Sequence, residues 1–225
     1  MNRTLAIGDI HGCLDALKTL LQVVAPTEDD HVVFLGDCVD RGPDSKGVLD
    51  LIMDLQAEAP FRISVIMGNH ELMMIRSTTE ERLFSSWYLS FGGYATLRSF
   101  GLTDQDQNWP EQIPTVYWEF MRNTLPYVET DSHIFVHASV DAELPMSEQS
   151  DEWLLWTRCD RTGRHISGKP VICGHTAQTS GEVLARPHMI CIDTYPLGQW
   201  LTCYCAETRE YWQASLTGQT RTGQL

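Results

Sequence analysis

Three short polar segments, each placed directly after an apolar run of strand character, constrain the fold of this chain most. They are Gly8-Asp9-Ile10-His11-Gly12, Gly36-Asp37-Cys38-Val39-Asp40-Arg41-Gly42 and Gly68-Asn69-His70-Glu71. Two further histidines, His137 and His175, also follow apolar runs. Open α/β sheets bind ligands at the carboxyl ends of their strands. The pattern therefore predicts an α/β fold in which several strand ends share one polar site.

The first third of the chain follows the order strand, helix, strand, helix, strand. Strands are expected at residues 4–8, 31–36 and 63–68. Leucines at helical spacing predict a helix that begins at Leu14 and stops before Pro26, and a second helix opens at Pro43 and closes at Pro60. Helices between strands at this spacing predict parallel strand pairing.

The remainder predicts a helical insert and a return to strands. The insert covers about residues 71–129, is rich in aromatic side chains, and starts its last helix at Trp109-Pro110. Further strands are expected at 134–136, 171–173, 189–192, 201–205 and 211–212, with a short helix at 152–156. The polar tail from Thr217 is expected to fray. Because nothing resembles a linker, residues 1–225 are expected to form a single domain.

The net charge and the cysteine content limit which binding partners and which cellular compartment we expect for this protein. The net charge of −14 disfavours nucleic acid and anionic membranes as partners, and no apolar run is long enough to cross a bilayer. Seven cysteines without a CxxC pair and a start without signal-peptide character predict a cytoplasmic protein with reduced thiols. A soft metal site at Cys203 and Cys205, two residues apart in one strand, is the minor alternative to simple burial.

The donor atoms of the strand-end residues favour a two-metal site. Mixed oxygen and nitrogen donors suit Mn, with Fe or Zn as alternatives, and a carboxylate such as Asp37 can bridge two ions. Two divalent cations would outweigh the negative charges of Asp9 and Asp37. The pocket would then carry a net positive charge, which suits a phosphate group. The candidate ligands are Asp9, His11, Asp37, Asn69, His137 and His175.

Neighbouring residues suggest how a phosphate would be handled. Arg41 and Arg158 would add positive charge and donate paired hydrogen bonds to phosphate oxygens. His70, next to Asn69, is a candidate proton donor to a leaving group, and Asp40 is positioned in sequence to orient it.

Each of these residues also has a plain structural interpretation. A single Asp or Asn after a strand is commonly a turn or cap residue, and a single His is commonly a hydrogen-bonded strand residue. Glu71 is interpreted as a first-turn helix residue stabilised by the helix dipole. The remaining histidines receive no site role: His31, His133, His165 and His188. The combination of motifs, rather than any one residue, supports the two-metal hypothesis.

At these motifs the sequence resembles the PPP-type metallophosphatases, with their GDxHG, GDxxDRG and GNHE signatures, and most of all their small bacterial and phage members of the lambda-phosphatase type. The resemblance runs from Leu5 to about Thr194. Shorter matches lie at Ser90-Phe91-Gly92-Gly93, Val136-His137-Ala138, Leu155-Trp156-Thr157-Arg158, Gly174-His175-Thr176 and Ile192-Asp193-Thr194. It implies a metallophosphoesterase β-sandwich of two mixed sheets flanked by helices.

The resemblance also implies roles for the site residues. One metal would be held by Asp9, His11 and Asp37, and the other by Asp37, Asn69, His137 and His175. Arg41, Asn69 and Arg158 would bind phosphate. A hydroxide that bridges the metals would attack phosphorus directly, with His70, paired with Asp40, as the general acid.

The activity expected from the resemblance is that of a manganese-dependent phosphoprotein phosphatase. Its substrates would be phosphoserine and phosphothreonine in proteins or peptides, with phosphotyrosine as a side activity. One alternative is a symmetrical diadenosine tetraphosphate hydrolase, although those relatives tend to have Ala at the position of Asp40. A second alternative is a non-catalytic phospho-binding scaffold.

Overall fold

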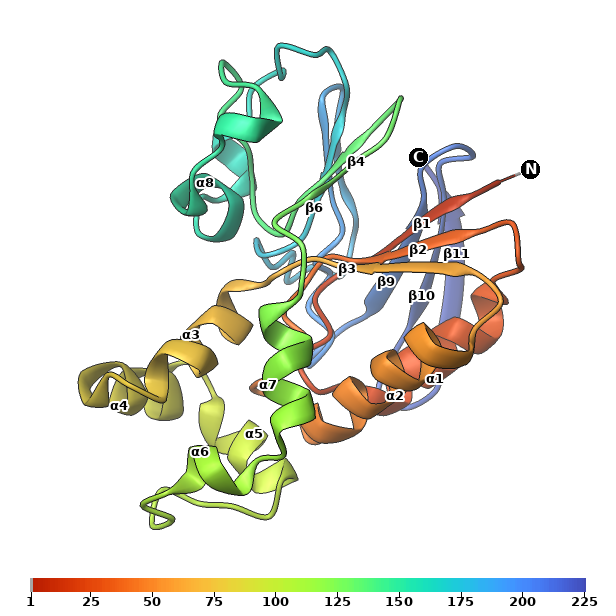
Figure 1. Cartoon of the computed structure of the whole chain (residues 1–225). Coiled ribbons are helices and arrows are strands. Elements are labelled where there is room, and N and C mark those ends of the chain that lie inside the picture. Colours follow the sequence, from red (N-terminus) through yellow and green to blue (C-terminus); the bar gives the residue numbers. More distant parts are fainter. Residues whose placement is uncertain (1) are drawn as a thin grey trace.

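The computed structural model describes residues 2–225 and confirms the strand–helix alternation of the N-terminal third (Figure 1). Three parallel strands are joined by two helices: β1 (Thr4–Ile7), α1 (Leu14–Val24), β2 (His31–Phe34), α2 (Ser45–Glu58) and β3 (Arg62–Val65). Pro43 lies outside α2, since the Asp44 carboxylate accepts the Gly47 amide and caps the helix at Ser45. The second helix therefore begins two residues later than its proline suggested.

Three C-terminal strands extend this sheet on the other side of β1. They are β9 (Leu201–Cys205), β10 (Glu210–Ala214) and β11 (Thr220–Gln224), and the strand order is β11-β10-β9-β1-β2-β3. The expectation of a frayed tail was wrong. Antiparallel pairing with β10 satisfies the backbone of β11 in spite of its polar side chains, which suit a half-exposed edge strand.

A second sheet packs against the first. It contains β4 (Val128–Glu129), β5 (Ile134–Phe135), β6 (Val171–Cys173), β7 (Leu184–Arg186) and β8 (Met189–Cys191), in the order β4-β5-β6-β8-β7. Both sheets contain parallel and antiparallel pairs, which confirms the predicted sandwich of two mixed sheets. The edge strands β4 and β7 escaped prediction because they have only 2 and 3 residues.

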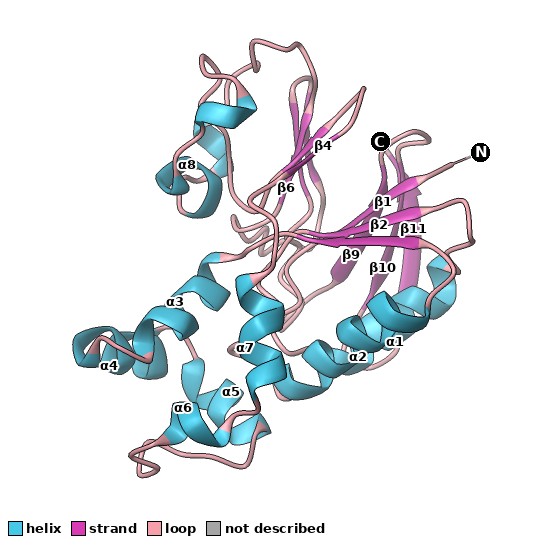
Figure 2. Cartoon of the chain, viewed as in Figure 1, coloured by secondary structure: helices cyan, strands magenta, loops and turns pink. Residues whose placement is uncertain are grey.

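The predicted insert is helical, as Figure 2 shows. Its helices are α3 (Asn69–Ser77), α4 (Glu81–Ser90), α5 (Gly93–Ser99), α6 (Trp109–Gln112) and α7 (Thr115–Arg122). Trp109-Pro110 begins α6, which is a single turn, so the last helix of the insert is α7. Beyond the insert lie η1 (Met146–Glu148), α8 (Asp151–Leu155) and η2 (Cys159–Arg161).

Apolar side chains form successive layers through the molecule. One cluster joins α1, α2 and the insert to the first sheet, with Leu17, Phe34 and Trp87 among its buried members. A second cluster fills the space between the two sheets and includes Val33 and Phe135. A third covers the outer face of the second sheet beneath α8. Burial on both faces holds the strands rigidly, so the loops at their ends start from fixed positions.

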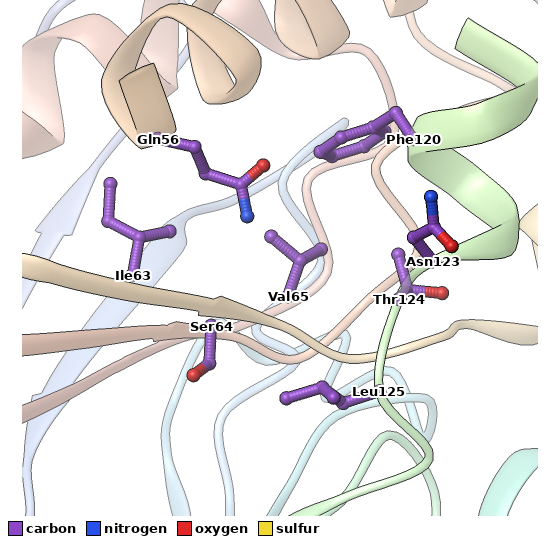
Figure 3. A pocket seen from close by; sticks show the side chains of 8 residues that line it. All are labelled: Gln56, Ile63, Ser64, Val65, Phe120, Asn123, Thr124 and Leu125. Carbon is purple, nitrogen blue, oxygen red and sulfur yellow. The ribbon is translucent and has the colours of Figure 1, made fainter. Parts of the chain in front are cut away.

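A cavity of about 350 Å³ lies beside the edge strand β3, away from these loops (Figure 3). Ile63, Val65, Phe120 and Leu125 line it together with the amide side chains of Gln56 and Asn123. This lining contains no titratable side chain. Among residues 2–225, no helix is both long and apolar enough to cross a membrane.

Candidate active site

The polar segments of the sequence converge where the strands of both sheets end. Backbone hydrogen bonds join the loops directly: the amide of His11 donates to the carbonyl of Asp37 at 2.8 Å, and that of Gly174 donates to the carbonyl of His137 at 2.8 Å. Gly174 tolerates no side chain, since a Cβ there would lie 2.0 Å from Oδ1 of Asp9. The loops therefore pack directly against one another, with the backbone of Gly174 against the carboxylate of Asp9.

Unusual backbone conformations concentrate in this region. Among residues 2–225, eight non-glycine residues have positive φ, and five of them are site residues, with φ between 46° and 70°. They are His11, Asp37, Asp40, Arg41 and His175. Such left-handed conformations cost free energy and persist only where the surroundings impose them, as they commonly do at functional sites.

Asp37 stands at the centre of the cluster, 2 % exposed. Its Oδ2 lies 3.6 Å from Nε2 of His11, and its Oδ1 lies 3.5 Å from Nε2 of His137. Each carboxylate oxygen therefore faces a different imidazole, one from each half of the site. This is the arrangement of a carboxylate that bridges two metal ions.

The histidine tautomers indicate what the cluster binds. Nδ1 of His11 donates to the carbonyl of Val39 at 3.0 Å, and Nδ1 of His137 donates to that of Leu35 at 2.9 Å. Both Nε2 atoms thus carry lone pairs, and that of His137 lies 3.0 Å from the amide oxygen of Asn69. Acceptors that face one another at these distances fit a cation between them, and Nδ1–H bonds to carbonyl groups are typical of metal-binding histidines.

His175 joins the same group through its Nδ1, 3.2 Å from Oδ1 of Asn69. Asp37, His137 and His175 offer ligand atoms within 4.8 Å of one another, as do His11, Asp37 and His70. Asp9 belongs to neither group; both of its carboxylate oxygens accept the backbone amide of His175 at 3.0 Å. Burial, followed by the charges of Asp193 and Asp37, raises the pKa of Asp9 well above its usual value. A cation nearby would relieve this repulsion.

His70 and Asp40 form a buried pair. Nδ1 of His70 donates to Oδ2 of Asp40 at 2.7 Å, which leaves Nε2 of His70 toward the site. Trp87 and Thr96 from the insert also donate to this carboxylate, each at 2.7 Å. Burial raises the pKa of Asp40 to about 7, although the hydrogen bonds from Thr96 and Trp87 act to lower it. Burial also lowers the pKa of His70. The sequence analysis had noted only that the insert is rich in aromatic side chains and had singled out neither Trp87 nor Thr96.

The two arginines are placed differently. Arg41 donates from Nη1 to Nε2 of His11 and from Nη2 to Nε2 of His70, both at 2.9 Å. Both arginines are exposed. The charge of Arg158, behind burial as the main cause, contributes to lowering the pKa of His175. Arg41 therefore lies inside the cluster, whereas Arg158 lies at its border.

Glu71 has a larger role than its position in the first turn of α3 suggested. It is 2 % exposed, and its carboxylate accepts the amides of Asp37 at 2.9 Å, Cys38 at 2.8 Å, Val39 at 3.2 Å and Gly68 at 2.9 Å. It thus holds the loop that carries Asp37 and Asp40. The sequence signal was the fixed spacing of Glu71 from Gly68, which places it at the third position of the helix.

The four histidines without a predicted role form hydrogen bonds with residues outside the ligand cluster. His31 pairs with the hydroxyl of Ser64, His133 with that of Ser132, His165 with Ser167, and His188 with the carbonyl of Thr162. No third metal-ligating residue joins Cys203 and Cys205 among residues 2–225, so the structure does not support a soft metal site there.

A cavity of about 470 Å³ opens beside Arg41. Gly42 and Pro43 form one side, and Tyr94 and Arg98 of α5 form the other. The amide of Arg41 donates to the carbonyl of Gly92, which ties the start of α5 to the loop that carries Asp37, Asp40 and Arg41. A substrate would therefore have space next to the arginine.

Comparison with known proteins is consistent with this geometry. Residues 2–179 match the calcineurin-like phosphoesterase family. The chain is 45 % identical over 71 residues to the symmetrical bis(5'-nucleosyl)-tetraphosphatase of Legionella pneumophila strain Lens, which covers 31 % of this chain and 24 % of that protein. It is 33 % identical over 98 residues to the serine/threonine-protein phosphatase PP2A-like PPG1 of Saccharomyces cerevisiae, covering 44 % and 26 %. The matched segments span about a quarter of each relative.

A solved structure shows the same fold. The cold-active protein-tyrosine phosphatase of a psychrophilic Shewanella species superposes with a TM-score of 0.67 at 16 % identity, covering 98 % of this chain and 80 % of that one. Because the family match spans most of the chain and includes all six predicted metal ligands, the chain belongs to the calcineurin-like phosphoesterase family.

Proposed function

We propose that this protein is a metal-dependent phosphomonoesterase that acts on phosphoserine and phosphothreonine in peptides, with phosphotyrosine as a side substrate. The observation that carries the proposal is the buried His70–Asp40 pair, held at 2.7 Å and braced by Trp87 and Thr96. A serine alkoxide is a poor leaving group and needs a proton. An imidazole oriented by a carboxylate is suited to supply it.

The roles follow from the positions of the side chains. Asp37, His11, Asn69, His137 and His175, with Asp9 beside them, would hold two divalent ions, for which Mn²⁺ fits the mixed donors. When bound, such ions stabilise phosphoryl oxygens and supply a nucleophile at neutral pH. Arg41 would bind the phosphate, Arg158 would approach it from the border, and Nε2 of His70 would protonate the leaving oxygen.

A second candidate is symmetrical hydrolysis of a dinucleoside tetraphosphate. The relatives named by the sequence comparison support it more strongly than they support a protein phosphatase. The cavity beside Arg41 adds a structural argument, since Tyr94 is 49 % exposed and could stack on a base while Arg98 binds the additional phosphates. Such a leaving group is a stabilised anion and needs little protonation, so this reaction would depend less on Asp40.

Purified protein supplied with Mn²⁺ should be assayed against a phosphoserine peptide, p-nitrophenyl phosphate and diadenosine tetraphosphate. We expect the highest kcat/KM on the peptide. Release of ADP from the dinucleotide with no action on peptides would reverse the order of the two candidates. Absence of turnover on all three would favour a binding scaffold.

Variants of the acid pair test the mechanism. His70→Asn should reduce phosphoserine hydrolysis about 10²-fold or more and p-nitrophenyl phosphate hydrolysis much less, because nitrophenolate leaves without a proton. Asp40→Ala should follow the same pattern and leave any dinucleotide activity nearly unchanged. His133→Asn, at a histidine outside the site, is the matched control. Equal losses on both monoesters would remove His70 from the role of general acid.

A further inference from the structure

A second group of potential metal ligands lies outside the phosphoesterase cluster and consists of cysteines alone. The sulfur atoms of Cys159, Cys173 and Cys191 all lie within 4.8 Å of one another. They come from η2, β6 and β8, and all three residues have no measurable exposure. Segments up to 32 residues apart in sequence therefore bring three thiols to one point.

The sheet fixes two of the three thiols. Cys173 and Cys191 are register partners on the adjacent parallel strands β6 and β8, so their side chains leave the same face of the sheet side by side. Cys159 approaches from the 3₁₀ turn that covers this face, where its amide donates to Oγ1 of Thr176 at 3.0 Å. The surrounding side chains are apolar and include Val171, Leu155 and Met189.

The remaining buried thiols are not arranged in this way. Within residues 2–225 all seven cysteines are buried and free, yet only these three gather in one ligand group. Simple burial of small apolar side chains explains isolated cysteines such as Cys13 and Cys203. It does not by itself account for three sulfurs that share a centre.

We propose that Cys159, Cys173 and Cys191 bind one thiophilic metal ion of the Cu⁺ or Zn²⁺ class, independently of the hard-donor site. Sulfur lies about 2.3 Å from such ions, so three sulfurs around one ion are about 4 Å apart, close to the spacing available here. Thiolates select soft ions, whereas the oxygen and imidazole donors around Asp37 suit harder ones. Three ligands satisfy Cu⁺, while Zn²⁺ would take a fourth.

Binding requires that thiol protons leave. The Cys191 thiol lies 3.4 Å from the carbonyl oxygens of Gly174 and Thr176, to which it donates, and its sulfur accepts from Nε2 of Gln178 at 3.9 Å. Metal binding would replace the thiol protons. The amide of Gln178 would remain as a donor to the thiolate.

The site would also stabilise the part of the ligand cluster that contains His175. Cys173 is two residues before His175, and Cys159 directly follows Arg158. An ion that links the three sulfurs would fix both segments to β8. It would act as a structural clamp and would not touch the substrate.

The test uses the full chain with Mn²⁺ in excess, so that the hard-donor site is saturated, and Cd²⁺ as the thiophilic probe. We expect one Cd²⁺ per chain with a thiolate-to-metal charge-transfer absorption. That band should be lost in Cys159→Ala and Cys191→Ala. It should persist in Cys203→Ala, a matched buried thiol, and in Asp37→Asn. Displacement of Cd²⁺ by Cu⁺ or by Zn²⁺ then identifies the preferred ion.

Circular dichroism verifies that each variant is folded, and Cys159→Ser, which keeps the size of the side chain, replaces any alanine variant that is not. A band that survives in Cys159→Ala, or one lost equally in Cys203→Ala, would overturn the proposal. So would absence of the band both in the native protein and after refolding in the presence of Cd²⁺.

Discussion

The two halves of the ligand cluster are held in place to different extents by hydrogen bonds. The loops after β1, β2 and β3 are braced by charged hydrogen bonds: Glu71 accepts four backbone amides, and Asp40 accepts from His70, Trp87 and Thr96. The residues after β5 and β6 follow strands of 2 and 3 residues and have fewer such bonds, chiefly the His175 amide to the Asp9 carboxylate and Nδ1 of His137 to the carbonyl of Leu35. The His70–Asp40 pair, which is expected to move a proton, is thus held by the larger set of hydrogen bonds.

The strongest test of this comparison is Asp37→Asn, because Asp37 belongs to the first half and also faces His137 of the second. The variant loses the charge that joins the two ligand groups. We expect hydrolysis to fall by more than the roughly 10²- to 10³-fold that one lost transition-state contact costs, with a folded protein and poor retention of the second metal. Steady-state kinetics and metal analysis measure this. Two metals per chain with normal turnover would refute the two-metal interpretation.

Substituting each of the two arginines in turn compares the two halves of the cluster directly. Arg41→Ala should lower kcat/KM by about 10²-fold and weaken inhibition by inorganic phosphate, since Arg41 lies inside the cluster. Arg158→Ala should cause a smaller loss, of about 10-fold, because Arg158 lies at the border and influences His175 only through its charge. Arg122→Ala, on α7, serves as the control. If Arg158→Ala behaves as wild type on every substrate, Arg158 has no role in binding phosphate.

Stability should show the same asymmetry. Glu71→Gln places an amide group against backbone donors and should lower the free energy of unfolding by about 1–3 kcal/mol. Thr176→Val removes one acceptor, that of the Cys159 amide, and should cost about 1 kcal/mol. Urea denaturation of both variants, with the exposed Glu119→Gln as control, gives the comparison. If Thr176→Val lowers the free energy of unfolding more than Glu71→Gln does, the first half is not the more strongly hydrogen-bonded one.

An effect smaller than that of Glu71→Gln is expected away from the site, at Asp30. Its carboxylate accepts from Nε of Arg3 at 3.0 Å and from the amide of Thr27 at 2.7 Å, and these bonds, with that of Arg3 first, lower its pKa. A carboxyl group with a lowered folded-state pKa stabilises the fold above its unfolded value, near pH 4, and loses this contribution as pH falls. Asp30→Asn should therefore be less stable than wild type by about 1–2 kcal/mol at pH 7. The difference should shrink below about pH 4, as denaturation at several pH values would show.

Sequence alone determined the parts of this protein that depend on local pattern. The apolar runs before Asp9, Asp37 and Asn69 and the leucine spacing of α1 specify strands and helices through side-chain periodicity, which neighbouring residues carry themselves. The metal-ligand motifs were visible because each is contiguous. The tail strand β11 was not predictable, since its polar residues become a strand only by pairing with β10.

Only the tertiary structure decided which side chains complete the site. Trp87 and Thr96 reach Asp40 across 47 and 56 residues, and Glu71 reaches the loop of Asp37 across 34. The three thiols of Cys159, Cys173 and Cys191 likewise meet through sheet register and a covering turn. Hydrogen bonds and metal sites require atoms within a few ångströms, and that proximity between distant segments arises only when the sheets pack.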